Sequence, residues 1–217
     1  MLMCDRLILT ADASTLMEQF QVAGSAPAAH SLSPEWKPVG FVAAIVVREG
    51  ERRLERFRWG MMPFWAKDSV CADGEQIMEK RVYDRIVRKQ RCIIPCSAFE
   101  RVVKLKGASS PVRCTVRDRR VVGIAALYDM WDSASGDRLH TCTLLTLPNR
   151  RGELGDRLPV LLEGSDLDAW LDPSLTDKDV LQSLLRPTDA SRLVTVAAAR
   201  PGKQAADELD PAPPRFA

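Results

Sequence analysis

The sequence predicts an α+β fold: a mixed, mostly antiparallel, barrel-like sheet with a few peripheral helices. Short apolar or alternating runs, which are typical of strands, outnumber the helical patterns along the chain. The strands follow one another without the strand–helix alternation of a doubly wound parallel sheet. The 217 residues are 46% hydrophobic, which is normal for a globular protein with a sizeable core. We therefore expect a single domain over residues 1–207 and a Pro-rich tail over residues 208–217.

The first elements are a strand and a helix. Residues 7–10 form a short apolar run that predicts a buried strand. Residues 14–22 have helical spacing of apolar side chains, with Ser14 or Asp12 as the cap and Gly24 as the end.

A hairpin and a basic helix come next. Residues 41–47 and 53–59 predict two strands joined by a turn that contains Gly50. Residues 77–90 predict a helix that carries the densest basic run of the chain. A solvated helix face explains such a run more often than nucleic acid does.

The second half of the chain adds more strands than helices. The predicted strands are residues 92–95, 112–117, 121–127 and 140–147. Two short helices are expected, one over residues 165–171 with Ser165 as its cap and one over residues 177–185.

Charge and targeting signals exclude several classes. The 31 basic and 29 acidic residues give a net charge of +2, so any nucleic-acid surface must be a local patch. The N-terminus lacks the features of a signal peptide, and no apolar run is long enough to span a membrane. We expect a cytoplasmic protein without a membrane partner.

The six cysteines lack the spacing of a disulfide framework and are expected to be free thiols. Cys92 and Cys96 are the closest pair, but no histidine lies near them in the sequence, so a zinc site is not expected. We expect neither a metal nor a cofactor.

Residues 58–68 place two tryptophans on a turn-like connector broken by Gly60 and Pro63. Aromatic rings beside cations suit stacked nucleobases and phosphates, which makes Trp59, Trp65 and Lys67 candidate contacts for single-stranded DNA. The alternative is that the tryptophans close one end of the core.

Four stretches, in order, resemble motifs of the SOS response-associated peptidase family, also called the SRAP domain. They are residues 58–68 (RWGMMPFWAKD), 91–95 (RCIIP), 124–129 (IAALYD) and 156–162 (DRLPVLL). The resemblance covers about residues 3–200. It implies binding of single-stranded DNA near abasic sites and a covalent crosslink through an N-terminal cysteine.

The resemblance assigns the crosslink to Cys4, and it places Arg6 against a DNA phosphate. An abasic sugar opens to an aldehyde, an α-amine attacks it to give a Schiff base, and the neighbouring thiol closes a thiazolidine ring. This chemistry needs a free amine on Cys4. Translation from Met3 followed by removal of that methionine would supply it, and so would self-cleavage before Cys4. The remaining alternative is an inert thiol at the chain end.

Several pocket positions depart from the family pattern. The family's N-A-R-x-E-T aligns with residues 71–76, so that Cys71 replaces the asparagine and Asp73 the arginine. The family's histidine falls on Gly155, and by sequence position neither His30 nor His140 can substitute for it.

The family's catalytic glutamate follows its R-C-L-I-P motif by a few residues. Ungapped counting places Arg101 there, whereas a slip of one residue places Glu100. We prefer Glu100, because a proton shuttle needs a carboxyl group. An exposed glutamate at a strand end is the alternative.

Two functions from different classes follow. The first is an SRAP enzyme that senses abasic sites in single-stranded DNA and crosslinks to them through Cys4, with self-cleavage before that residue. The second is a catalytically degenerate member that only binds DNA or has a structural role, as the replacements at Cys71, Asp73 and Gly155 suggest.

Overall fold

A computed structural model describes residues 5–23, 34–62, 66, 69–105, 108–132, 138–152 and 154–198. The strands are β1 (Arg6–Ile8), β2 (Glu35–Trp36), β3 (Phe41–Arg48), β4 (Glu51–Trp59), β5 (Cys71–Asp73), β6 (Arg91–Cys96), β7 (Ala98–Leu105), β8 (Ala108–Val116), β9 (Val122–Asp132), β10 (Arg138–Pro148), β11 (Arg157–Pro159), β12 (Leu161–Leu162) and β13 (Leu193–Ala197). The helices are α1 (Ala13–Phe20), α2 (Gly74–Glu79), α3 (Asp84–Lys89), α4 (Gly164–Leu171) and α5 (Lys178–Leu184), with 3₁₀ turns η2 (Arg81–Tyr83) and η3 (Ala190–Arg192).

Five strands close into a barrel. Hydrogen-bonded pairs run from β10 to β4, β3, β6 and β9, and β9 pairs again with β10. All these pairs are antiparallel except β10–β4, and β5 adds a further parallel pair along β10. The predicted α+β fold with a mostly antiparallel, barrel-like sheet is confirmed.

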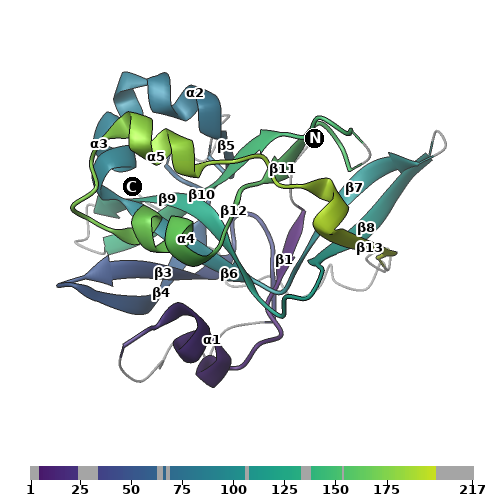
Figure 1. Ribbon diagram of the computed structural model, residues 1–217, viewed down its shortest axis with the longest axis horizontal. Coiled ribbons are helices and arrows are strands. Elements are labelled where there is room, and N and C mark those ends of the chain that lie inside the picture. Colours follow the sequence, from purple (N-terminus) through teal and green to yellow (C-terminus); the bar gives the residue numbers. More distant parts are fainter. Residues whose placement is uncertain are drawn as a thin grey trace, which may run out of the picture.

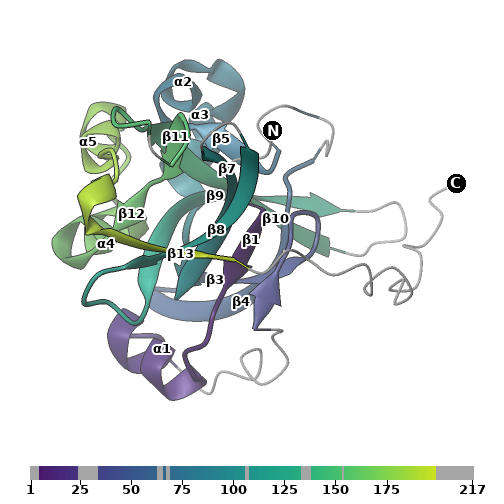
Figure 2. The same cartoon turned by 90° about the vertical axis from the view of Figure 1, so that its right-hand side faces the viewer.

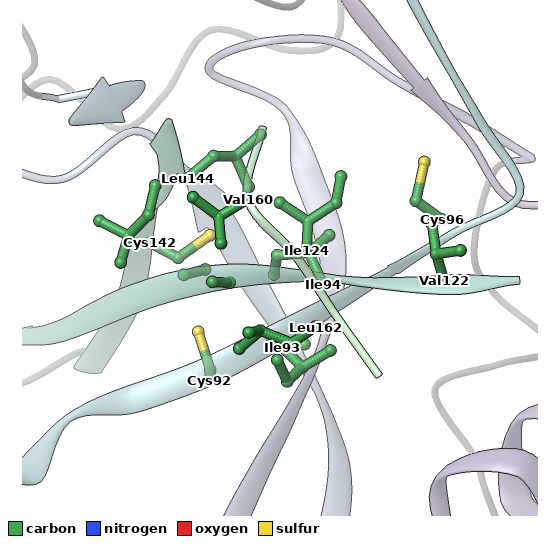
Figure 3. Packing of buried hydrophobic residues seen from close by; sticks show 14 of the residues in the cluster. Cys92, Ile93, Ile94, Cys96, Val122, Ile124, Cys142, Leu144, Val160 and Leu162 are labelled. Carbon is green, nitrogen blue, oxygen red and sulfur yellow. The ribbon is translucent and has the colours of Figure 1, made fainter. Parts of the chain in front are cut away.

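The barrel has an apolar interior to which several strands contribute. Figure 3 shows Cys92 and Ile94 of β6 among Ile124 of β9 and Cys142 and Leu144 of β10, all with 0% exposure. The β10–β4 pairing that closes the barrel is short, with Arg58 opposite Thr141 and Trp59 opposite Cys142, and the packing of the interior side chains contributes hydrophobic stabilisation.

A second sheet packs beside the barrel in the order β13-β8-β7-β1-β2 (Figure 2). Its register makes one cross-strand row of Leu7, Phe99 and Cys114, which are all buried in the common core. Because side chains alternate along a strand, the next row faces the other way. That row consists of Arg6, Glu100 and Arg113, whereas Arg101 lies on the same face of β7 as Phe99.

The helices α2, α3, α4 and α5 gather on one side of the barrel, away from β7 and β8 (Figure 1). Arg91, at the start of β6, holds several of them. Its buried guanidinium donates hydrogen bonds to five backbone carbonyls, those of Val87, Arg88, Trp170, Asp172 and Leu175. One side chain thereby satisfies carbonyls at the ends of α3 and α4. No helix among the described residues is long and apolar enough to cross a membrane.

The single helix predicted over residues 77–90 is wrong. The chain forms α2, η2 and α3, and Lys80 between them is extended (φ −74°, ψ 115°). The break resets the helical phase, so that Ile77 and Val87 are both buried while Val82 is 77% exposed. Burial of the side chains in the core outweighs the continuous helical pattern.

Other boundaries were predicted with mixed success. The 41–47 and 53–59 hairpin is confirmed, and Asp12 caps α1 by accepting from the amide of Thr15, whose hydrogen bonds lower the pKa of Asp12 to about 2. Helix α4 begins one residue before Ser165, which is not its cap.

The edge strand β13 was not predicted, because four of its five side chains are exposed and give no burial pattern. The predicted tail, residues 208–217, and its boundary lie outside the described residues.

We expect Arg91→Met to lower the free energy of unfolding by about 3 kcal/mol or more, because buried carbonyls lose a charged donor. Urea unfolding followed by tryptophan fluorescence measures this change. Arg53→Met, which removes an exposed arginine of β4, should change stability by less than about 0.5 kcal/mol. Equal losses in the two variants would contradict the role given to Arg91.

Candidate functional site

A cluster of polar groups forms where β5, β7 and β11 meet. Arg157 at the start of β11 donates from Nη2 to Asp73 Oδ1 at 2.8 Å and to the carbonyl of Thr146 at 2.8 Å. Arg101 of β7 donates from Nη1 to the carbonyl of Arg157 at 2.6 Å. The same guanidinium lies against Gly155, in the turn between β10 and β11. These contacts link segments that are far apart in the sequence.

Arg101 faces the interior because strand alternation places it on the same face of β7 as buried Phe99. Only 3% of the residue is exposed. Its Nε is buried and has no hydrogen-bond partner among the residues that the structure describes. The site therefore contains a buried cation whose Nε has no partner within the described part of the chain.

Gly155 adopts a left-handed conformation with φ +87°, and a Cβ at this position would lie 2.4 Å from Arg101 Nη2. The guanidinium thus takes the space of a side chain at residue 155. The side-chain Nδ2 of Asn149 donates to the Gly155 carbonyl at 2.9 Å and fixes the turn. A larger residue at 155 is excluded as long as Arg101 keeps this position.

Asp73 has a structural task at the start of α2. Its carboxylate accepts from the amides of Glu75 and Gln76, which caps the helix, and it pairs with Arg157. Cys71 lies two residues earlier on β5, on the same face of the strand, and is partly exposed.

Glu100 does not face this cluster. It lies on the opposite face of β7, where Arg113 Nη2 contacts its carboxylate at 2.7 Å and Arg6 Nε at 3.5 Å. Glu100 therefore does not meet Gly155, whereas Arg101, the residue that the ungapped count selects, lies against it. Arg6 also donates to Glu35 at 2.7 Å, so that two carboxylates already compensate the cation predicted to meet a phosphate.

Trp59 also differs from its prediction as a stacking residue. Its side chain has 0% exposure, and its Nε1 donates to the carbonyl of Val70 at 2.9 Å. The alternative, a tryptophan that closes the core, is the one the structure shows. Cys4, Trp65 and Lys67 lie outside the described residues.

The residue after Cys4 is well anchored. The amide of Asp5 donates to the carbonyl of Glu100 at 2.9 Å, and its carboxylate accepts from the amide of Val102 at 2.9 Å. Strand β7 therefore holds the chain at Asp5 immediately beside Arg101.

Four other cysteines are poor nucleophiles. Burial raises the pKa of Cys96 to about 12 and of Cys114 to about 11, and it also raises the pKa of Cys92 and Cys142. His140 lies against Glu55 and Phe57, with its Nδ1 at 3.4 Å from Glu55 Oε2. Among the described residues no group of three or more histidine, cysteine or acidic side chains could hold a metal.

Comparison with known proteins assigns the family. The family model for "SOS response associated peptidase (SRAP)" matches residues 3–200. This chain belongs to the SRAP family. It is 33% identical over 198 residues to the abasic site processing protein YoqW of Bacillus subtilis (strain 168), with 87% of this chain and 88% of that protein covered. It is also 30% identical over 163 residues to the abasic site processing protein YMR114C of Saccharomyces cerevisiae, covering 68% of this chain and 44% of that protein.

The fold agrees with solved structures. A crystal structure of a protein from Bacteroides thetaiotaomicron superposes with a TM-score of 0.78 over 90% of this chain and 92% of that chain. The sequence identity is 22%, so this likeness concerns the fold alone.

Arg101 and Gly155 are in contact, and both lie at positions that depart from the SRAP motifs given above. By the ungapped count, Arg101 stands where the family pattern has its glutamate, and Gly155 stands where it has its histidine. Without a Cβ, Gly155 leaves the room that the longer arginine fills. Sequence analysis placed Arg101 and Gly155 at these positions by ungapped counting, but it preferred Glu100 and did not predict the contact between Arg101 and Gly155.

We expect Gly155→Ala to lower the free energy of unfolding more in the parent protein than in a protein that already carries Arg101→Ala. In the parent, the new Cβ meets the guanidinium and also strains the left-handed backbone, whereas without Arg101 only the backbone strain of about 1–2 kcal/mol remains. Urea unfolding of the four proteins gives the coupling energy, which should be about 1 kcal/mol or more.

Gly152→Ala is the matched control. Gly152 lies in the same turn with φ +69°, and a Cβ there meets nothing within 4 Å. This substitution should lower the free energy of unfolding by the same amount in the presence and in the absence of Arg101. Equal costs of Gly155→Ala in both backgrounds would contradict the pairing of Arg101 with Gly155.

Proposed function

We propose that this protein acts on single-stranded DNA that contains abasic sites and that Cys4 forms the covalent bond to the sugar. Similarity over most of the chain to proteins named for abasic site processing supports the substrate. The anchoring of Asp5 carries the assignment to Cys4. Because Cys4 directly precedes Asp5, it is bonded to a residue that β7 holds next to Arg101 and the Gly155 turn.

The proposed reaction needs no oxidant and no metal. The α-amine of Cys4 adds to the aldehyde of the opened sugar, and the carbonyl oxygen leaves as water to give an imine. The thiol then adds to the imine carbon, its proton passes to the nitrogen, and a five-membered thiazolidine closes. A free amine on Cys4 is required, either by a start at Met3 and loss of that methionine or by cleavage of the bond before Cys4.

The surroundings make this reaction slow. Glu100 is committed to Arg6 and Arg113, and no imidazole lies among the described groups of the cluster. A positioned general acid or base typically contributes about a hundredfold or more, and the proposed reaction proceeds without that contribution. Proximity of the amine and the thiol on adjacent carbons provides the remaining assistance.

A second candidate function is binding of abasic DNA without the crosslink. The observation that favours it is the Arg101–Gly155 replacement, because it puts a cation where an acid–base pair would be needed. A guanidinium can attract a phosphate or a sugar oxygen, but it cannot exchange protons at neutral pH.

The test uses protein expressed from Met3 without an N-terminal tag, with an intact mass that confirms Cys4 as the first residue. We expect it to form an adduct with an abasic single-stranded oligonucleotide slowly, with a band that survives denaturing electrophoresis. Cys4→Ser should form none, because the ring needs the thiol. Cys71→Ser, which removes a partly exposed thiol without an adjacent amine, should react like the parent.

Two outcomes would contradict the crosslink. An adduct of equal yield in Cys4→Ser would assign the chemistry to another group. Absence of any adduct after long incubation, with the DNA still bound, would leave the binding function as the correct one. An oligonucleotide of the same sequence without the abasic site should give no adduct with either protein.

A further inference from the structure

An exposed aromatic side chain and an arginine form a stacked pair at one end of the β3–β4 hairpin. Phe41 is 37% exposed, and the guanidinium carbon of Arg56 lies 3.8 Å from the centre of its ring. Phe41 pairs with Arg58 and Ala43 pairs with Arg56, so the stacked residues are diagonal neighbours on one face of the hairpin. The pair presents a flat, cationic surface to solvent.

The turn before β3 adds an apolar residue held in an unfavourable conformation. Val39 is 46% exposed and has φ 69°, which is rare for a β-branched residue. Its amide donates to the carbonyl of Trp59 at 2.7 Å, and the amide of Trp59 donates to the carbonyl of Gly40 at 2.8 Å. Val39 and Gly40 thus lie opposite the single residue Trp59, which is a β-bulge. The bulge changes the direction of the Val39 side chain. Such strain at an exposed position is typical of functional surfaces.

The region around Phe41 includes two cations, Arg56 and Lys37. Among the described residues neither Arg56 nor Lys37, which lies in the same turn as Val39, forms an ion pair. Elsewhere on the hairpin Arg48, Arg52 and Arg53 each pair with an acidic side chain. The surface therefore has positive charge available for a partner that carries negative charge.

We infer that Phe41, Arg56, Lys37 and Val39 form a contact surface for undamaged nucleotides of a single DNA strand. A nucleobase supplies a flat face for the Phe41–Arg56 pair, and the backbone phosphates meet the two cations. Solvent-facing Phe41 takes the stacking role that was predicted for Trp59, which is buried. The inference rests on the proposed function, because it concerns the strand in which the abasic site lies.

The surface lies within reach of the site. Strands β4 and β5 both pair in parallel with β10, where Arg58 is opposite Thr141 and Asp73 is opposite Thr146. Five residues of β10 span roughly 17 Å. A strand of several nucleotides that passes the Arg101–Gly155 turn can therefore reach Phe41, whereas a very short one cannot.

The experiment measures binding of a fluorescent oligothymidylate of about 15 nucleotides, without abasic sites, by anisotropy at several salt concentrations. Phe41→Ala and Phe41→Leu should each weaken binding by about 5- to 150-fold, because both lose the ring. Arg56→Gln should weaken binding and make the slope of log affinity against log salt shallower by about 0.7. Arg53→Gln, an exposed and paired arginine on the same strand, is the control and should leave the slope unchanged.

The inference is overturned if both Phe41 variants, with unchanged melting temperatures, bind as tightly as the parent. It is also overturned if the parent fails to bind the oligothymidylate at low salt, or if Arg53→Gln and Arg56→Gln change the slope equally. Because this oligonucleotide has no aldehyde, a failure of the crosslink leaves the result unaffected. Conversely, a crosslink that forms at the parent rate in Phe41→Ala supports the proposed function but gives no support to the contact surface around Phe41.

Discussion

The register of β1 on β7 is the constraint on which the candidate site depends. Arg6 lies opposite Glu100 and Leu7 opposite Phe99, so that a single cross-strand row fixes which side chains of β7 enter the core. The apolar row packs against the barrel, and burial of Phe99 makes any shift by one residue costly. Arg101 then points inward, and the same register anchors Asp5.

This constraint explains why the polar residues of the site differ from the SRAP pattern in a coordinated way. While the Arg101 guanidinium keeps this position, a Cβ at residue 155 would collide with it, and Gly155 leaves the space free. Asp73 meets the nearby cation of Arg157 and caps α2, which an arginine at the same position could not do. The departures at positions 73, 101 and 155 therefore form one connected arrangement of charges around the turn.

Much of the fold could be predicted from the sequence, because hairpin periodicity and apolar runs reflect burial directly. The hairpin of β3 and β4 is an example. The broken helix at Lys80 and the solvent-facing edge strand β13 could not be predicted, since tertiary packing decides the first and exposure hides the second.

The site was harder to predict than the fold. A tryptophan next to cations has the same sequence pattern whether its ring stacks on DNA or, as Trp59 does, fills the core. The choice between Glu100 and Arg101 depends on which face of β7 is buried, and that follows from pairing with β1, a contact between residues far apart in the chain. The requirement for a carboxylate favoured Glu100, whereas the ungapped spacing selected Arg101, which is the residue that lies against Gly155.

We propose that Arg101 and Gly155 together stand in place of the acid–base pair of the SRAP pattern, so that the proposed crosslink through Cys4 forms without that pair. The most direct measurement is the rate of adduct formation on abasic single-stranded DNA by a protein that carries both Arg101→Glu and Gly155→His. Histidine tolerates the left-handed backbone better than most residues, and the glutamate leaves room for it. We expect the double variant to form the adduct about a hundredfold or more faster than the parent, and we expect Cys4→Ser to abolish the adduct. A folded double variant that reacts no faster than the parent would contradict it.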